Sequence, residues 1–317
     1  MTPPSLRETA PSRLVTVCPD CHGSVERVAG DGGLRCRGCG ATYPRRAAVD
    51  VFLTEEEWRA WLSHRESHDP GLGKYERARR DSPLNILYND QWVSWMFGEL
   101  PDTCRGALLE MMCGGAEICR RLPARFSAAL AMDVNVPSLE RAARELEAAG
   151  EHRVRVVAAS ADRVPLAAET VDVVMIQGGL HHTRPLLGRT LREIHRVLRP
   201  GGMMVASEPA NDHWLTRAIR HWQYAHSHLQ GDDEGEDGFT RQEIATACAS
   251  AGLRLERYRQ FGFVAYPFIG NTDIIPLLST SRWMGLGRAL LALDRALERV
   301  PIVRGMAWAS IWRAVKA

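Results

Sequence analysis

Four cysteines near the N-terminus have the spacing of a metal site. They form two CxxC pairs, Cys18 with Cys21 and Cys36 with Cys39, and fourteen residues separate the pairs. A turn in each pair can aim both sulfurs at one point, and Zn²⁺ prefers a closed tetrahedron of four thiolates where its role is structural. A redox CxxC is the alternative, but two pairs without a thioredoxin-like context disfavour it. The spacing therefore predicts a structural zinc site within residues 17–53.

Two acidic residues stand at the ends of neighbouring apolar runs. Glu110 closes one run and leads into the small-residue loop Cys113-Gly114-Gly115, which a helical stretch follows. Asp133 ends the next run, about 20 positions further on. In a doubly wound sheet, ligands bind at the carboxyl ends of the strands, where small residues let a cofactor approach the backbone. A carboxylate at the second position can accept hydrogen bonds from ribose hydroxyls, so the spacing indicates a nucleoside-containing cofactor.

The elements that must position these residues follow an alternating pattern. From about residue 106, short apolar runs alternate with helical stretches, which indicates βαβ units and a parallel sheet. The predicted strands are 107–111, 129–133, 153–157, 171–176 and 202–207, with strand-like stretches at 253–264 and 306–315. Helices are predicted over 84–99, 137–149 and 185–198. A capping-box pattern at Thr240 to Glu243 predicts the start of another helix.

Further segments complete a set of motifs: Ala159–Leu166, Val171–Val174, Gln177–His182 and Glu193–Gly202. Together with the two acidic strand ends, they resemble the motif set of class I S-adenosylmethionine (SAM) dependent methyltransferases of the type 11 kind. The resemblance covers residues 106–210. It implies a Rossmann-like α/β fold with a seven-stranded sheet, whose last strand, at 306–315, is reversed. It also implies an enzyme that transfers a methyl group from SAM.

The resemblance assigns cofactor roles by position. Asp133 would hold the ribose, Asp162 would accept from the adenine amino group, and Gln177 would face the amino-acid end of SAM. The full set of cofactor-binding residues that it implies is Glu110, Cys113, Gly114, Gly115, Asp133, Val134, Ala161, Asp162 and Gln177.

Three residues depart from the family pattern. Met112 and Ala116 stand where the family usually has glycine, and Ser160 stands where aspartate is common. The side chain of Met112 would crowd the cofactor unless the loop shifts. These departures motivate one alternative, a chain that uses the fold as a non-catalytic scaffold.

Two adjacent histidines are the candidates for catalysis. His181 and His182 follow the fourth strand of the motif set, at the mouth of the expected cleft. An imidazole can take up a proton near neutral pH, so one of them is predicted to act as a general base where the acceptor needs one. The alternative is a histidine pair without a catalytic role, which is common in the family.

The domain plan combines these units. We expect a disordered tail over 1–16, the zinc ribbon over 17–53, a helical linker or lid over 54–100, and the methyltransferase domain over 101–317. The last unit contains an apolar insert, 267–300, that is predicted to form a helical cap on the acceptor pocket. The insert could instead make a membrane-surface or homodimer contact.

Composition narrows the location and the partners. The net charge of +2 argues against a protein held on nucleic acid by bulk charge alone. No apolar segment reaches the ~18 residues that a membrane span needs, and no signal peptide is evident. We therefore expect a cytoplasmic protein, in which metal ligation by the cysteines is favoured over disulfides.

Residues 17–53 resemble the zinc-ribbon module of the tRNA-methyltransferase activator subunit family, which implies recognition or scaffolding. We expect a small-molecule acceptor, because the predicted cap is apolar and no Asn/Asp-Pro-Pro-Tyr motif is present. The alternative enzyme is an RNA base methyltransferase that uses the ribbon for RNA recognition. In that case basic residues would contact phosphates, and the candidates are Arg45, Arg46, Arg77, Arg79, Arg80, Arg120 and Arg121.

Overall fold

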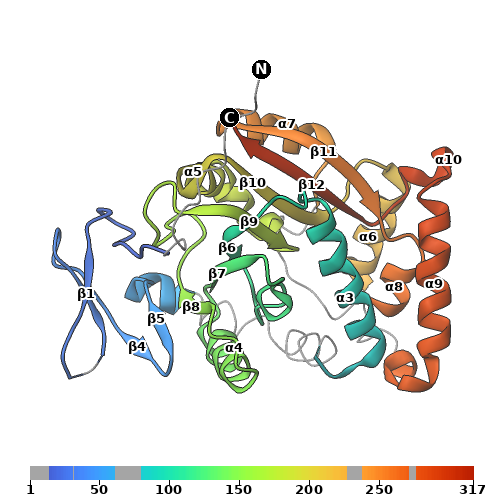
Figure 1. Cartoon of the computed structure of the whole chain (residues 1–317). Helices are drawn as coiled ribbons and strands as arrows, with labels where there is room; N and C mark the ends of the chain where they lie inside the picture. The colour runs from blue at the N-terminus through green and yellow to red at the C-terminus, as the bar shows by residue number, and fades with distance from the viewer. Residues whose placement is uncertain (1–13, 31, 61–79, 227–237, 271–275) are drawn as a thin grey trace.

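The computed structural model describes residues 14–30, 32–60, 80–226, 238–270 and 276–317. Within these residues, a sheet of nine strands runs through the molecule in the order β11-β12-β10-β9-β6-β7-β8-β5-β4, and a three-stranded sheet, β1-β2-β3, lies in the N-terminal part (Figure 1). The predicted tail up to residue 13, Trp61 to Arg79 of the predicted linker and the acidic run 231–237 lie outside the described residues.

The large sheet confirms the predicted Rossmann-like architecture. Its parallel core pairs β8 with β7, β7 with β6, β6 with β9 and β9 with β10, while β12 runs antiparallel to β10. The reversed last strand is therefore present. The strands from the predicted methyltransferase unit are β6 (Gly106–Met111), β7 (Phe126–Asp133), β8 (Val154–Ala158), β9 (Val171–Gln177), β10 (Leu198–Pro209), β11 (Leu253–Phe261) and β12 (Ala309–Lys316).

Helices cover both faces of this sheet. They are α3 (Pro83–Gly98), α4 (Val136–Ala148), α5 (Leu187–Val197), α6 (Trp214–His226), α7 (Arg241–Ser250), α8 (Ala265–Ile269), α9 (Met284–Leu297) and α10 (Pro301–Arg304). The predicted capping box begins α7: the Thr240 hydroxyl accepts from the Glu243 N–H, and the Glu243 carboxylate accepts from the Thr240 N–H. The two reciprocal bonds satisfy donors that a helix start leaves free.

The side chains of each strand point alternately to the two faces of the sheet, and a separate hydrophobic core lies on each face. On β6, Leu108 belongs to a core shared with α3, α4, α8 and α9, whereas Leu109 belongs to a core shared with α5 and α7. Successive side chains of a strand point to opposite faces, so both faces of a covered parallel sheet must be apolar. The apolar runs in the sequence therefore reflect a sheet with helices on both sides.

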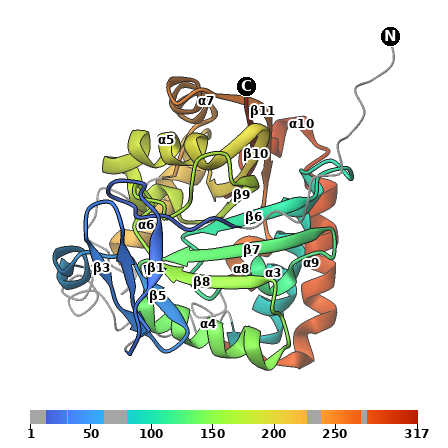
Figure 2. The same cartoon turned by 60° about the vertical axis from the view of Figure 1, so that its left-hand side comes forward.

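The N-terminal unit extends the sheet beyond the seven expected strands. Its three-stranded part consists of β1 (Val25–Arg27), β2 (Leu34–Cys36) and β3 (Thr42–Tyr43), and β4 (Arg45–Arg46) and β5 (Val49–Val51) form a hairpin. Strand β5 pairs in parallel with β8, and the Phe52 N–H donates to the Ala158 carbonyl at 2.7 Å. Figure 2 shows this unit beside β8. The hairpin covers an edge that β8 would otherwise expose.

The opposite side of the molecule is formed by α3 and the insert after β11 (Figure 1). Helices α8 and α9 carry the described part of the predicted cap, with 3₁₀ turns at Pro276–Ser279 and Ser281–Trp283. Aromatic side chains fill the space between α3, β11 and α8 in edge-to-face contacts. They are Tyr88, Trp92, Trp95, Phe261 and Tyr266. Among the described residues, no helix has the length and apolar character to span a membrane.

Candidate functional site

The loop after β6 has left-handed backbone at the positions where glycine was expected. Met112 has φ 53° and Ala116 has φ 59°, and Gly114 between them has φ 49°. Residues with a Cβ rarely adopt this region, whereas glycine does so at no steric cost. The loop thus keeps the shape for which glycine is suited, with two side chains added. Met112 packs against the next loop, since a Cβ on Gly179 would lie 2.6 Å from the Met112 Cβ.

Asp133 lies at the carboxyl end of β7 and holds this loop. One carboxylate oxygen accepts from the Gly114 N–H at 2.8 Å, and the other accepts from the Asn135 N–H at 2.8 Å. Asp133 is half-buried. No atom lies within 4 Å of a Cβ built on Gly114, so the loop beside this carboxylate has open space.

Glu110 is buried at the end of β6 and binds the turn that follows the loop. Its carboxylate accepts from the Ile118 N–H at 3.0 Å and from the Cys119 N–H at 2.7 Å. Burial raises the pKa of Glu110 to about 7, although the two N–H donors act in the opposite direction. Cys113 in the loop is buried too, and burial raises the pKa of its thiol, which keeps it neutral.

Gln177 ends β9, and its side-chain amide is hydrogen-bonded on one side. Its Nε2 donates to the Asn89 Oδ1 at 2.7 Å, and the Asn89 Nδ2 donates to the Glu117 carboxylate at 2.8 Å. The Gln177 Oε1 is buried and has no hydrogen-bond partner among the residues that the structure describes. Because buried polar atoms are nearly always paired, this oxygen marks a place for a donor from a ligand. Sequence reasoning missed Asn89 and Glu117, because neither stands in a motif.

The loop after β8 carries the two residues assigned to adenine. Ala161 is buried, and Asp162 accepts from the Ser160 hydroxyl at 2.6 Å and forms an ion pair with Arg189 at 3.3 Å. Ser160, which stands where aspartate was expected, therefore positions the Asp162 carboxylate. The neighbouring assigned residue, Val134 after β7, is partly buried and packs against the core of α3 and α4.

His181 and His182 lie after β9 but differ in environment. His181 is 8% exposed, and its Nδ1 lies 2.7 Å from the Glu208 carboxylate, which is fully buried at the end of β10. Glu208 also accepts N–H bonds from Gly179, Leu180 and His181. An ionised carboxylate only accepts, so Nδ1 carries the proton and Nε2 is left as an acceptor. His182 is exposed, and its ring centre lies 4.0 Å from that of His181.

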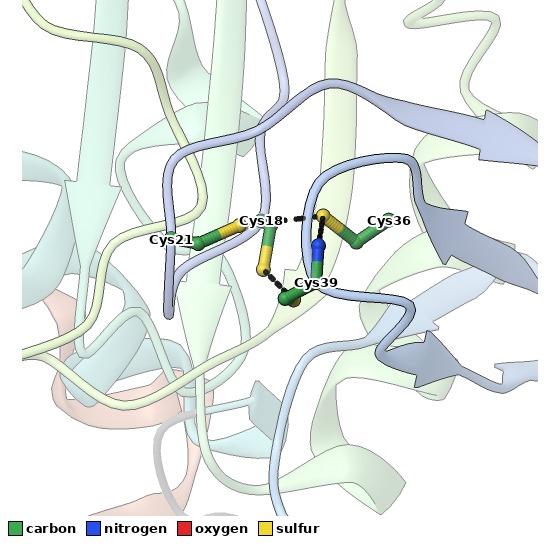
Figure 3. A group of neighbouring side chains, drawn as sticks. All are labelled: Cys18, Cys21, Cys36 and Cys39. Atoms are coloured by element: carbon green, nitrogen blue, oxygen red, sulfur yellow. Dashed lines mark hydrogen bonds between the residues drawn. The ribbon is translucent and has the colours of Figure 1, made fainter.

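The four cysteines of the ribbon converge as their spacing predicts (Figure 3). Their sulfur atoms all lie within 4.8 Å of one another, with Cys18 and Cys39 at 3.7 Å and Cys21 and Cys36 at 3.4 Å. A tetrahedron with Zn–S bonds of about 2.3 Å places sulfurs about 3.8 Å apart, so the set fits Zn²⁺.

The turn that follows Cys36 suits a thiolate at this position, although neighbouring thiols raise the pKa of Cys21 and Cys39. The N–H groups of Cys39 and Gly38 point at the Cys36 sulfur and lower the pKa of Cys36 to about 6. A Cβ on Gly23 would lie 3.2 Å from the sulfurs of both Cys21 and Cys36, so only glycine leaves the centre uncrowded.

A cavity of about 770 Å³ lies away from all of these residues. It opens along β11 and the ends of α3 and α9, and its lining includes Trp95, Tyr258 and Arg299. None of the predicted site residues lines it.

Comparison with known proteins supports the methyltransferase fold. The family model described as a methyltransferase domain matches residues 109–206. The ubiquinone/menaquinone biosynthesis C-methyltransferase UbiE of Syntrophotalea carbinolica is 33% identical over 135 residues, which are 40% of this chain and 55% of that protein. The uncharacterized protein YafE of Escherichia coli is 27% identical over 114 residues, which are 33% of this chain and 55% of that protein. The chain thus spans about half the length of these relatives.

Solved structures share the fold. One is a chain from the complex of the Haloferax volcanii Trm112 methyltransferase activator with a methyltransferase, with a TM-score of 0.51, 16% identity, and coverage of 83% of this chain and 99% of that chain. Another is the cyclase SpnF, with a TM-score of 0.50, 18% identity, and coverage of 72% and 80%. At these identities the likeness shows the methyltransferase fold alone, which also occurs in a protein named as a cyclase.

Proposed function

We propose that this chain binds SAM at the carboxyl ends of β6 to β9 and transfers its methyl group to a small-molecule acceptor. The observation that carries the proposal is the buried Gln177 oxygen at the end of β9, which accepts no hydrogen bond from any described residue. Glu110 and Asp133 lie at the carboxyl ends of β6 and β7, the next two strands of the sheet. Strand order reverses between β6 and β9, and ligands of doubly wound sheets bind at this switch point.

Different residues around the switch point would bind different parts of SAM. Asp133, at the carboxyl end of β7, would accept hydrogen bonds from the ribose hydroxyls. Ala161 and Asp162 would contact the adenine. The Gln177 oxygen would accept from the ammonium group at the amino-acid end, which satisfies the buried oxygen.

Bound SAM would supply an electrophilic methyl group on a sulfonium. The role of the protein is then to align the acceptor with that methyl group and to exclude water. His181 is the proposed general base: its Nδ1–H is held by Glu208, so its Nε2 can hold a proton taken from the acceptor. His182 is the second candidate, although its exposure makes it less constrained.

A small-molecule acceptor fits the surface better than RNA does. Of the basic residues that sequence analysis offered for phosphate contacts, those that the structure describes interact with other residues of the protein. Arg45 pairs with Asp50, Arg80 with Asp81, Arg120 with Glu145, and Arg121 with Glu117 and Asp90. Arg46 lies over the Trp58 ring. Arg77 and Arg79 lie outside the described residues. Charges that are already paired gain less from phosphate contact. Loss of methyl acceptance after RNase treatment of a substrate pool would reverse this choice.

Calorimetric titration of the full chain with S-adenosylhomocysteine (SAH) and SAM tests the cofactor site. We expect binding in the micromolar range, and Asp133→Ala should weaken it by about 10- to 100-fold, because charge-assisted hydrogen bonds are lost. Asp102→Ala is the matched control, since this carboxylate is exposed and precedes β6 at the other end of the strand. A folded chain that binds neither ligand would support the scaffold alternative instead.

A further inference from the structure

The loop that would hold adenine, residues 159–166, contacts two regions of the protein. On the cleft side, the Ala159 N–H donates to the Asp133 carbonyl at 3.0 Å. On the other side, the Val17 N–H of the ribbon donates to the Pro165 carbonyl at 3.1 Å. Ribbon and loop also share one buried core, in which Cys18, Tyr43 and Phe52 belong with Ala159, Ala161, Val164 and Leu166.

Arg163 links this loop to the metal-binding turn. One guanidinium nitrogen forms an ion pair with Asp20, and the other donates to the Glu57 carboxylate at 2.7 Å. Asp20 lies between the ligands Cys18 and Cys21 in the chain. The contact therefore runs from the residue after the proposed adenine acceptor to a residue inside the zinc knuckle.

The knuckle holds Asp20 from its other side as well. The Tyr43 hydroxyl donates to the second Asp20 oxygen at 3.0 Å and lies 2.9 Å from the Cys18 sulfur. The position of Asp20 thus depends on the turn that the metal closes and on a residue that touches a ligand sulfur. The Arg163 side chain is 23% exposed, so solvent screens its ion pairs only in part.

Helix α5 holds the same loop from another side. Glu193 accepts from the Val164 N–H at 2.9 Å, and Arg196 donates to the carbonyls of Val164 and Leu166. Arg189 of α5 also pairs with Asp162, so the helix holds both parts of the loop. Residues 161–163, which include the proposed adenine contacts, have their side-chain link to the ribbon through Arg163.

We propose that Arg163 is a positioning residue that couples zinc binding in the ribbon to cofactor binding in the cleft. This inference rests on the proposed function, because it assigns the loop to adenine. Two binding events that favour the same loop position must strengthen each other by the same factor. SAH should therefore raise the affinity of the ribbon for zinc, and zinc should raise the affinity of the cleft for SAH. A merely structural ion pair would lower stability when removed but would leave no such reciprocity.

The experiment measures zinc affinity of the full chain by competition with a chelator, with and without saturating SAH. We expect SAH to tighten zinc binding by about five- to tenfold. Arg163→Ala should abolish this factor while one zinc per chain remains bound at low chelator concentration. Arg37→Ala is the matched control, because Arg37 also belongs to the ribbon but pairs with Glu26, away from the loop.

A second readout locates the effect at the adenine end. Arg163→Ala should weaken SAH and 5′-methylthioadenosine equally, whereas Gln177→Ala should weaken only SAH, which carries the amino-acid end. Asp20→Asn keeps the shape of the knuckle and should reproduce the Arg163→Ala result even if that variant folds poorly.

The outcomes separate the two claims. If the wild-type chain binds SAH but its zinc affinity is the same with and without SAH, the coupling is wrong and the proposed function stands. If SAH tightens zinc binding in Arg163→Ala as much as in the wild type, the proposed role of Arg163 is also wrong. If the wild-type chain does not bind SAH at all, both the function and the coupling fall.

Discussion

The four-cysteine cluster and the proposed cofactor cleft are built in opposite ways. The four sulfurs come from two turns within residues 18–39, and the second turn points two of its own backbone N–H groups at the Cys36 sulfur. The cleft instead draws Glu110, Asp133, Asp162 and Gln177 from separate strand ends and loops, which only the sheet brings together. The first site is local in sequence, whereas the second is formed only by the fold. We therefore expect loss of one cysteine to abolish zinc binding altogether, and loss of one cleft residue to weaken cofactor binding only in part.

Removing one sulfur gives the largest expected effect. Cys36→Ser should reduce the zinc content from one per chain to none, because a structural Zn²⁺ needs its closed set of four ligands. Zinc binding supplies much of the folding free energy of such small units, about 10–16 kcal/mol in zinc-finger peptides. Atomic spectroscopy of the purified protein measures the metal, and thermal unfolding measures the loss of stability.

Cys104→Ser provides the control for this change. Cys104 is also a buried free thiol, but it lies before β6 and outside the cluster. Its variant should keep the zinc. Retention of zinc by Cys36→Ser at wild-type affinity would show that the centre is not a closed four-sulfur site, and the contrast between the two regions would weaken.

The same contrast explains what sequence could predict. The four ligands followed from spacing alone, and the strands β6 to β10 followed from apolar runs, because a sheet covered on both faces requires them. The carboxyl ends of parallel strands share one edge, so the placement of Glu110, Asp133 and Gln177 at neighbouring strand ends also followed. Their roles toward SAM remain predictions until binding is measured.

Titration of Glu110 gives the next largest effect. Burial raises its pKa to about 7, whereas an exposed glutamate titrates near 4.5. Because the folded state holds the proton more tightly, protonation of Glu110 stabilises the folded state. This contribution is complete below about pH 4.5 and is lost as the pH rises through 7. The loss amounts to about 3 kcal/mol.

Urea unfolding of the wild type and of Glu110→Gln between pH 4 and pH 8 measures this loss. Glutamine does not titrate. Between pH 4 and pH 8, the unfolding free energy of the wild type should therefore fall by about 3 kcal/mol relative to that of Glu110→Gln. Taking the difference removes the contribution of other titrating groups, which the two proteins share. A difference that is independent of pH would show that Glu110 stays ionised and that its two N–H donors outweigh its burial.

Contacts between distant segments were beyond the sequence. Arg163 lies within a motif, yet its partners Asp20 and Glu57 are more than a hundred positions away. The pairing of β5 with β8 joins segments equally far apart, and a three-residue strand carries little pattern of its own. Asn89 reaches Gln177 only because α3 packs across the sheet. Tertiary packing decides such contacts, and no local propensity encodes them.

Two glycines provide the finest test, because both have positive φ and open space around the Cβ position but lie in different regions. Gly40 in the ribbon has φ 78°, Gly114 in the cleft has φ 49°, and no atom lies within 4 Å of a Cβ built on either. Alanine at each position should cost about 1 kcal/mol of unfolding free energy through backbone strain, measured in urea. Only Gly114→Ala should also weaken SAH in calorimetry, since its new methyl group enters the space assigned to the cofactor. Equal SAH affinity in the two variants would show that the open space beside Gly114 is not where the cofactor lies, and the proposed site would then have to move toward Gln177.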